Sequence, residues 1–267
     1  MHRLFFFSTI AATLAACSEN NCNVNQLDEA TCQHFQLITG SVYDGDAATF
    51  ASLCKYPVRR PYPLRWIEDS VQMVEYFPIL VDDSLKKICR DITPDDWWQA
   101  GWRGYTFGDG SYIWDDYGTI SINYISAAES ALINILSRHE LESLHPELRQ
   151  GATPYFCFID EADSTIYRID ITDNTADSDD ISLRLAIYPH GCELNGLPYT
   201  LMPGIRTTEG SSHVQRLMFN NDKGESLYFI YDPSEYERRT AAHITIGDST
   251  VTHPIHFIYW RDYAHRH

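Results

Sequence analysis

The chain of 267 residues carries 37 acidic side chains against 20 basic ones, a formal charge of -17 at pH 7 with histidine counted as neutral. Such a charge repels phosphate backbones and anionic lipid surfaces, so nucleic acid is excluded as a natural partner. Hydrophobic residues make up 44% of the sequence and aromatic residues 13%. This apolar content is enough for a folded core and excludes a disordered acidic chain.

Residues 1–16 have the anatomy of a secretory signal peptide. His2 and Arg3 precede an apolar stretch that is too short to cross the roughly 30 Å hydrocarbon core as a helix. We therefore expect this leader to be removed on export. The stretch ends in LAAC at 14–17, which resembles the lipobox of bacterial lipoproteins. The resemblance implies that Cys17 is acylated and becomes the first mature residue, with residues 17–25 as a lipidated tether.

The expected location is the periplasmic face of the cell envelope, with the N-terminal lipid as the contact to a membrane. Ser18 follows the lipidated cysteine, which resembles the sorting class of outer-membrane lipoproteins. Past the leader, no apolar run approaches the length of a transmembrane helix. We therefore expect the acyl chains to supply any membrane attachment.

The cysteines predict disulfide bridges, because an oxidising compartment favours them. Of the seven cysteines, Cys17 is assigned to the lipid, which leaves an even set of six. The six candidates are Cys22, Cys32, Cys54, Cys89, Cys157 and Cys192. The last two stand alone in the second half of the chain and are predicted to pair with each other, while the pairing of the first four stays open.

Residues 26–126 predict an α+β domain. Apolar residues recur with helical spacing, and Asp46 is placed to cap the second helix. A run of aromatic residues and glycines around residues 108–110 predicts a β-hairpin, which a third strand completes as a meander. The predicted helices cover 26–43, 47–55, 66–76 and 82–90, and the predicted strands cover 102–107, 112–114 and 119–124.

The rest of the chain predicts a connecting segment over 127–150, with a helix at 127–144, and then an all-β domain over 151–267. Short strands separated by turn clusters favour antiparallel pairing in a sandwich or a barrel. The fold class is therefore α+β: helices on a curved antiparallel sheet, followed by an all-β sandwich or barrel of about eight strands. These strands are predicted at 155–159, 165–171, 182–188, 199–206, 214–219, 226–231, 241–246 and 251–259.

Several strings of residues resemble a family of uncharacterised exported bacterial lipoproteins. In the first half they are ASLCKYPV at 51–58, WQAGWRGYTFGDG at 98–110 and ISIN at 120–123. The resemblance implies that this half is similar to the nuclear transport factor 2 fold, a cone of helices on a curved sheet. The second half resembles the β-rich companion domain of that family through YRID at 167–170, RLAIY at 184–188, TEGS at 208–211 and YFIY at 228–231.

The sequence supplies no metal-binding or cofactor-binding motif. His139 and Glu140 begin like the helix of a zinc protease, but Ser143 stands where the second histidine ligand belongs. We therefore predict that Glu140 and Glu142 lie on a solvated helix face. His253 and His256 are three residues apart on a predicted strand, so their side chains point to opposite faces. We expect neither a metal nor a cofactor.

We interpret the protein as a non-catalytic binding protein for a small ligand, a glycan or peptide, or an envelope protein that it inhibits or assists. Enzymes of the cone fold place an acid–base set in the cavity, and no such set can be matched residue by residue. The alternative is a small hydrolase or isomerase that uses carboxylates of the cone-like domain. The candidate ligand-binding residues are Trp66, Trp102, Tyr105, Trp114 and Asp115.

Overall fold

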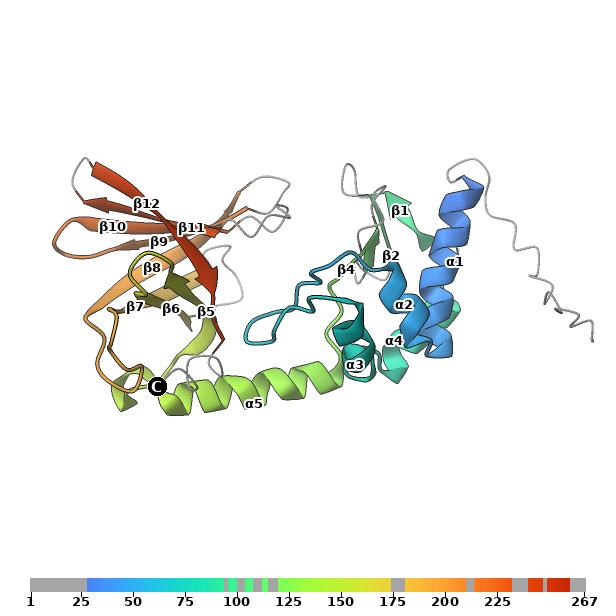
Figure 1. Ribbon diagram of the computed structural model, residues 1–267, viewed down its shortest axis with the longest axis horizontal. Helices are drawn as coiled ribbons and strands as arrows, with labels where there is room; N and C mark the ends of the chain where they lie inside the picture. The colour runs from blue at the N-terminus through green and yellow to red at the C-terminus, as the bar shows by residue number, and fades with distance from the viewer. Residues whose placement is uncertain are drawn as a thin grey trace, which may run out of the picture.

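The computed structural model describes residues 28–93, 96–99, 104–107, 112–114, 120–173, 181–209, 214–231, 240–246 and 249–259. The predicted leader and the tether lie outside these residues. The described part of the chain contains five α-helices and twelve strands, which confirms the α+β class. In Figure 1, four helices and a short sheet form one unit, eight strands form the other, and a long helix connects them.

The first two helices follow the predicted positions closely because short polar side chains cap them. Helix α1 spans Glu29–Asp44 and α2 spans Ala47–Leu53. The carboxylates of Asp28 and Asp46 accept backbone N–H groups in the first turn of each helix, as N-cap residues do. Gly45 ends α1 with a φ of 75°, a left-handed conformation that glycine adopts without steric cost.

The next two helices are also capped by aspartates. Helix α3 spans Ser70–Leu80 and begins after the N-cap Asp69, four residues later than predicted. Helix α4 spans Asp83–Asp91 after the N-cap Asp82, close to its predicted position. The late start of α3 leaves Trp66 in the loop before the helix. This loop forms one wall of a pocket beside α3 and α5.

The predicted hairpin and third strand form a sheet together with one additional strand. The strands are β1 (Trp98–Gln99), β2 (Tyr105–Phe107), β3 (Tyr112–Trp114) and β4 (Ile120–Ile122), paired in that order and antiparallel throughout. Aromatic side chains join this sheet to α1. Phe35 stacks on Trp97 with ring centroids 3.6 Å apart, and Tyr105 meets Phe35 edge to face at 5.5 Å. These aromatic residues therefore contribute to the core of the unit.

Helix α5 spans Ala127–Ser143 and runs from the helical unit to the strands. It begins with a capping box, in which Ser126 and Glu129 each bond to the backbone N–H of the other. A short 3-10 helix, Pro146–Leu148, follows it. The predicted ending before Pro146 is confirmed, because proline disfavours the helical conformation in the residue before it.

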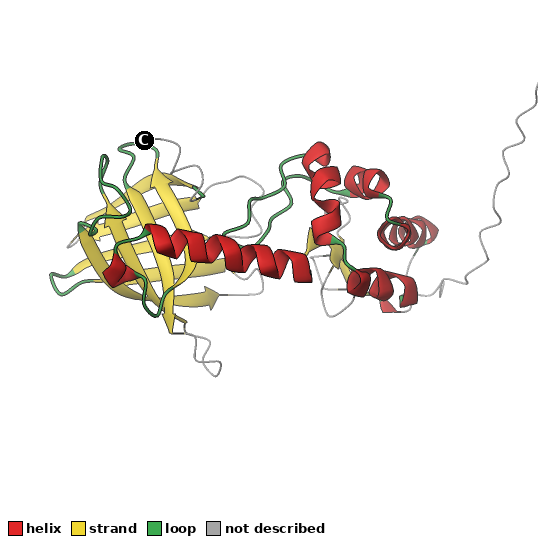
Figure 2. Ribbon diagram, turned by 90° about the horizontal axis from the view of Figure 1, so that it is seen from below, coloured by secondary structure: helices red, strands yellow, loops and turns green. Residues whose placement is uncertain are grey.

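All eight strands predicted for the second half are present, and they close into a barrel. Each strand pairs antiparallel with the next along the chain, and β12 pairs back with β5. Figure 2 shows the strands wrapped around one another with α5 passing alongside. The strands are β5 (Thr153–Asp160), β6 (Ile166–Asp173), β7 (Ile181–Tyr188), β8 (Thr200–Glu209), β9 (Val214–Asn220), β10 (Glu225–Tyr231), β11 (Thr240–Ile246) and β12 (Ser249–Phe257).

Aromatic side chains are central to the barrel core. Phe158 and Phe229 stack with centroids 5.5 Å apart, and Phe219 meets Phe229 edge to face at 5.9 Å. Gly204 on β8 makes room for this packing, because a Cβ at that position would overlap the ring of Phe219 and the carbonyl oxygen of Met218. Glycine in a strand often marks such a close approach.

The structure does not form the predicted bridge between Cys157 and Cys192. Cys157 is a free thiol, buried beside Leu144 and Leu148 on the face of the strands that the end of α5 covers. The count of cysteines could not show that this position belongs to a core. Cys54 and Cys89 are also free thiols, and burial raises the pKa of each to about 12. Cys22 lies outside the described residues.

Candidate functional site

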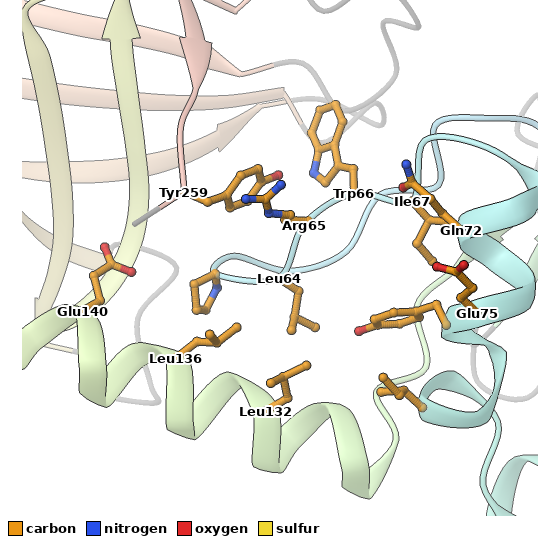
Figure 3. A pocket seen from close by; sticks show the side chains of 13 residues that line it. Leu64, Arg65, Trp66, Ile67, Gln72, Glu75, Leu132, Leu136, Glu140 and Tyr259 are labelled. Atoms are coloured by element: carbon orange, nitrogen blue, oxygen red, sulfur yellow. The ribbon is translucent and has the colours of Figure 1, made fainter. Parts of the chain in front are cut away.

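A pocket of about 400 Å³ lies between the helical unit and the barrel. This volume is within the range of small-molecule sites, about 300–1,000 Å³. Figure 3 shows that the loop after residue 62, α3 and α5 surround it, with Tyr259 contributed by the segment after β12. Its lining residues are Pro63, Leu64, Arg65, Trp66, Ile67, Gln72, Glu75, Tyr76, Ile79, Leu132, Leu136, Glu140 and Tyr259.

The pocket is mainly apolar, with aromatic rings along the loop side. Leu132 and Leu136 project from α5 toward Leu64 on the opposite loop. The ring centroids of Trp66 and Phe257 lie 5.5 Å apart, and the Cζ atom of Arg65 lies 5.8 Å from the ring centroid of Tyr259. Apolar walls with a few fixed polar groups are typical of sites for small organic molecules.

One face of α5 combines the wall of the pocket with two buried carboxylates. Glu129 and Glu140 are eleven positions apart (140 minus 129), about three turns at 3.6 residues per turn, so they share a face with Leu132 and Leu136. Both carboxylates are buried, with Glu129 0% and Glu140 1% exposed. The helix therefore presents an apolar stripe with an acidic group at each end.

At the first end, Glu129 forms a bidentate ion pair with Arg60. The Arg60 Nε donates to Oε1 at 2.7 Å and Nη2 donates to Oε2 at 2.6 Å, while both side chains are 0% exposed. Arg60 also donates to the carbonyl oxygens of Ile122 and Tyr124, at 2.6 and 2.7 Å. The Tyr76 hydroxyl donates to Glu129 Oε1 at 3.0 Å. This centre joins the 59–67 loop, the sheet, α3 and α5.

At the second end, Glu140 holds α5 against the barrel. Its Oε1 accepts hydrogen bonds from Arg168 Nη1 on β6 and from the Tyr62 hydroxyl, the latter at 2.7 Å. Arg168 also donates to Asp170 at 2.6 Å, and Asp170 accepts a further bond from Arg184 at 2.9 Å. The other oxygen, Glu140 Oε2, is buried and has no hydrogen-bond partner among the described residues.

The prediction that Glu140 lies on a solvated face is wrong. Burial raises its pKa, although the nearby Arg168 cation and the bond from Tyr62 lower it in part. Burial also raises the pKa of Tyr62 well above its ordinary value, and the negative charge of Glu140 adds to the effect. Glu142 does lie in solvent, with its side chain 61% exposed.

Of the five candidate residues, the structure places Trp66 in the pocket. Tyr105 packs against Phe35 in the helical core and does not line the pocket. Trp114 belongs to β3, where its backbone pairs with Tyr105. Trp102 and Asp115 lie outside the described residues.

Sequence reasoning missed the contribution of α5 to the site. The available signal was the spacing of Glu129, Leu132, Leu136 and Glu140, which places two carboxylates in line with an apolar stripe. Such a pattern on a helix normally indicates that the carboxylates reach solvent at the margin of the stripe. Here the two carboxylates are buried because each is paired with an arginine on a distant segment of the chain, Arg60 for Glu129 and Arg168 for Glu140.

No group of three histidine, cysteine, aspartate or glutamate side chains in the described ranges could hold a metal ion. None of the helices that the structure describes has both the length and the apolar character needed to cross a bilayer. Comparison with known protein families, with curated proteins and with solved structures finds no match for this chain.

Proposed function

We propose that the protein is a lipid-anchored binding protein of the bacterial cell envelope that holds a small, mainly apolar molecule in the pocket between its two units. The observation that carries the proposal is the pocket of about 400 Å³, lined by Leu64, Leu132 and Leu136 and framed by Trp66 and Tyr259. Burying a ligand against such walls is favourable by roughly 25 cal/mol per Å² of apolar surface.

The buried ion pairs beside the pocket support binding more than they support catalysis. A general acid or base needs a titratable group that can reach a substrate. Glu129 is occupied on both oxygens by Arg60, and Glu140 is held through Oε1 by Arg168 and Tyr62. These groups fix α5 and its apolar face in position, as a preformed binding site requires.

Attachment to the envelope rests on the leader and on the LAAC string that ends at Cys17. The proposed lipid would keep the binding protein at a membrane surface, on the periplasmic side and with the outer membrane as the expected destination. Growth with an alkynyl fatty acid should label the wild-type protein but not a Cys17→Ala variant. Label on the variant would contradict the anchoring.

The binding proposal is tested with the mature protein purified from its own envelope. Native mass spectrometry should detect a co-purified small molecule, and a fluorescent apolar probe such as N-phenyl-1-naphthylamine should bind and be displaced by it. Leu136→Trp fills the pocket and should abolish probe binding. The matched control is Ile135→Trp on the same helix, because Ile135 is 46% exposed and does not line the pocket. Equal probe binding by the two variants would refute the proposed site.

The alternative activity, a hydrolase or isomerase that uses carboxylates of the helical unit, has less support. Asp96 accepts bonds from the backbone and the hydroxyl of Thr93, as a turn residue does. Asp115 lies outside the described residues. Glu140 lines the pocket and burial raises its pKa, as such chemistry would favour. Its existing bonds to Arg168 and Tyr62 favour a structural role.

A further inference from the structure

We infer that the pocket binds a dipeptide with apolar side chains and holds it at both ends, with the terminal ammonium at Glu75 and the terminal carboxylate at Arg65. The inference rests on the proposed function and names the class of ligand that the pocket selects. Three features lead to it: two opposite charges on opposite sides of the pocket, an amide donor beside one of them, and an apolar wall between them.

The charges that a ligand can meet in the pocket are one of each sign. Three charged residues line it: Arg65, Glu75 and Glu140. Glu140 is 1% exposed and forms an ion pair with Arg168 on β6, so its charge is compensated within the protein. Arg65 and Glu75 are both exposed. A ligand with a single charge would pair with one of these two groups and leave the other to solvent.

The two charges stand apart. Figure 3 shows Arg65 together with Tyr259 on one side of the pocket and Glu75 on α3 at the opposite side. Glu75 has no hydrogen bond or ion pair with any residue that the structure describes, so Arg65 does not neutralise it. The guanidinium carries five N–H donors in a planar fork that matches a carboxylate, whereas the carboxylate of Glu75 accepts from an ammonium group. A molecule with both groups at its ends is complementary to this arrangement.

The amide donor indicates a peptide among the molecules that carry both charges. Gln72 precedes Glu75 by three residues on α3, so the two side chains are neighbours on one face of the helix. The Gln72 Oε1 accepts the backbone N–H of Glu68 at 3.0 Å, which leaves Nε2 to donate. In a peptide, the first carbonyl oxygen lies next to the terminal ammonium. With the ammonium at Glu75, this carbonyl oxygen can accept from Gln72.

The apolar wall sets the side chains and the length of the peptide. Leu132 and Leu136 project from α5 toward Leu64 between the two charged sides, and Leu64 is 3% exposed. Apolar side chains of a ligand would be removed from water against these leucines. The volume of about 400 Å³ is near the lower end for small-molecule sites. It therefore favours two residues over a longer peptide.

The test uses the full mature chain and four probes with the same two side chains: leucyl-leucine, its N-acetyl derivative, its C-terminal amide, and the derivative with both ends blocked. At pH 6.5 the terminal ammonium is charged, because its pKa is about 7.7–8.0. Displacement of N-phenyl-1-naphthylamine measures each affinity. Leucyl-leucine should bind about threefold more tightly than either singly blocked derivative and about tenfold more tightly than the doubly blocked one, since exposed ion pairs contribute a factor of up to about five each. Equal binding of all four, or tighter binding of any derivative, would overturn the inference.

Substitutions assign each end of the peptide. Glu75→Gln should abolish the loss of affinity on acetylation and retain the loss on amidation, and Arg65→Gln should do the reverse. The matched control is Glu142→Gln, because Glu142 is 61% exposed on α5 and does not line the pocket; both losses should persist in it. Gln72→Ala should weaken all four peptides by about threefold and leave binding of N-phenyl-1-naphthylamine unchanged. The inference is overturned if Glu75→Gln behaves like the control, if the two charge variants exchange their effects, or if Gln72→Ala binds the peptides like the wild type.

The apolar probe separates this inference from the proposed function. If N-phenyl-1-naphthylamine binds and none of the four peptides displaces it, the pocket binds apolar molecules and the inference alone is refuted. If the apolar probe fails to bind as well, the proposed function fails together with the inference. Binding of leucyl-leucine that Leu136→Trp abolishes and Ile135→Trp retains supports both.

Discussion

Replacement of Arg60 by methionine tests the centre that joins α5 to the 59–67 loop, the sheet and α3. Methionine keeps the length and apolar character of the side chain but removes four hydrogen bonds: two to Glu129 and one each to the carbonyl oxygens of Ile122 and Tyr124. Glu129 would remain as a buried charge. Removal of one partner from a buried ion pair costs about 3–5 kcal/mol, a large part of the 5–15 kcal/mol that stabilises a typical domain.

Thermal unfolding followed by circular dichroism measures this loss. For a chain of this size, each kcal/mol lowers Tm by about 2–4 °C, so Arg60→Met should lower it by about 6–20 °C. The matched control is Arg90→Met, because Arg90 pairs with Asp91 at the surface, where both side chains are more than half exposed. That variant should melt close to the wild type.

A double variant distinguishes the buried charge from lost packing. Adding Glu129→Leu to Arg60→Met removes the buried carboxylate that has lost its cation and should restore part of the lost stability. The recovery is partial because Glu129 also accepts bonds from Tyr76 and from the backbone N–H of Ser126, and because the carbonyl oxygens of Ile122 and Tyr124 stay without the guanidinium. Urea unfolding at pH 7 gives the free energies of unfolding. The reasoning is refuted if Arg60→Met resembles the Arg90→Met control, or if the double variant is less stable than Arg60→Met alone.

Four further outcomes are expected. Gly40 lies inside α1, and a Cβ at this position would have no atom within 4 Å. Differential scanning calorimetry should therefore show that Gly40→Ala raises the free energy of unfolding by about 1 kcal/mol. A lower free energy of unfolding would contradict the open space beside Gly40. Gly204→Val should lower Tm sharply, because its side chain would overlap Phe219; an unchanged Tm would show that the strand gives way. Burial raises the pKa of Glu140, so the folded chain binds the proton of this carboxyl group more tightly than the unfolded chain does. The contribution of Glu140 to the free energy of unfolding should therefore decline as pH rises above 4.5. Urea unfolding at pH values from 4 to 8 should show this decline in the wild type and not in Glu140→Gln. Burial raises the pKa of the Cys157 thiol, so a thiol reagent should modify it only after unfolding in urea, and rapid modification of the folded protein, located by peptide mapping, would contradict its burial.

Much of the architecture could be predicted because local chemistry determines it. Asp46, Asp82 and Ser126 cap helices near the predicted positions, and the eight barrel strands follow the alternation and turn clusters of the sequence. The start of α3 was placed too early because helical spacing of apolar residues continues upstream, while the cap that decides the start is Asp69.

The pocket could be predicted only in part, because residues far apart in the chain build it. Trp66 was among the candidate residues, but Leu136 and Tyr259 reach the same cavity from α5 and from the segment after β12. No local pattern relates these positions. Similarly, the burial of Glu140 depends on Arg168, 28 residues away in the sequence. Closure of the barrel and the docking of α5 bring these residues together, and sequence periodicity does not specify either.

Helix α5 is attached at two points, through Glu129 to the helical unit and through Glu140 to the barrel, so its length sets the distance between the two units. Its 17 residues make a rod about 25 Å long at 1.5 Å per residue, with Glu129 fixed at one end and Glu140 near the other. One residue inserted between them would lengthen the rod by about 1.5 Å and rotate Glu140 by about 100° away from β6. An insertion of seven residues, about two turns, would restore the facing to within about 20°. The spacing of helical unit and barrel can therefore change in coarse steps of about 10 Å, and finer adjustments would break one attachment or the other.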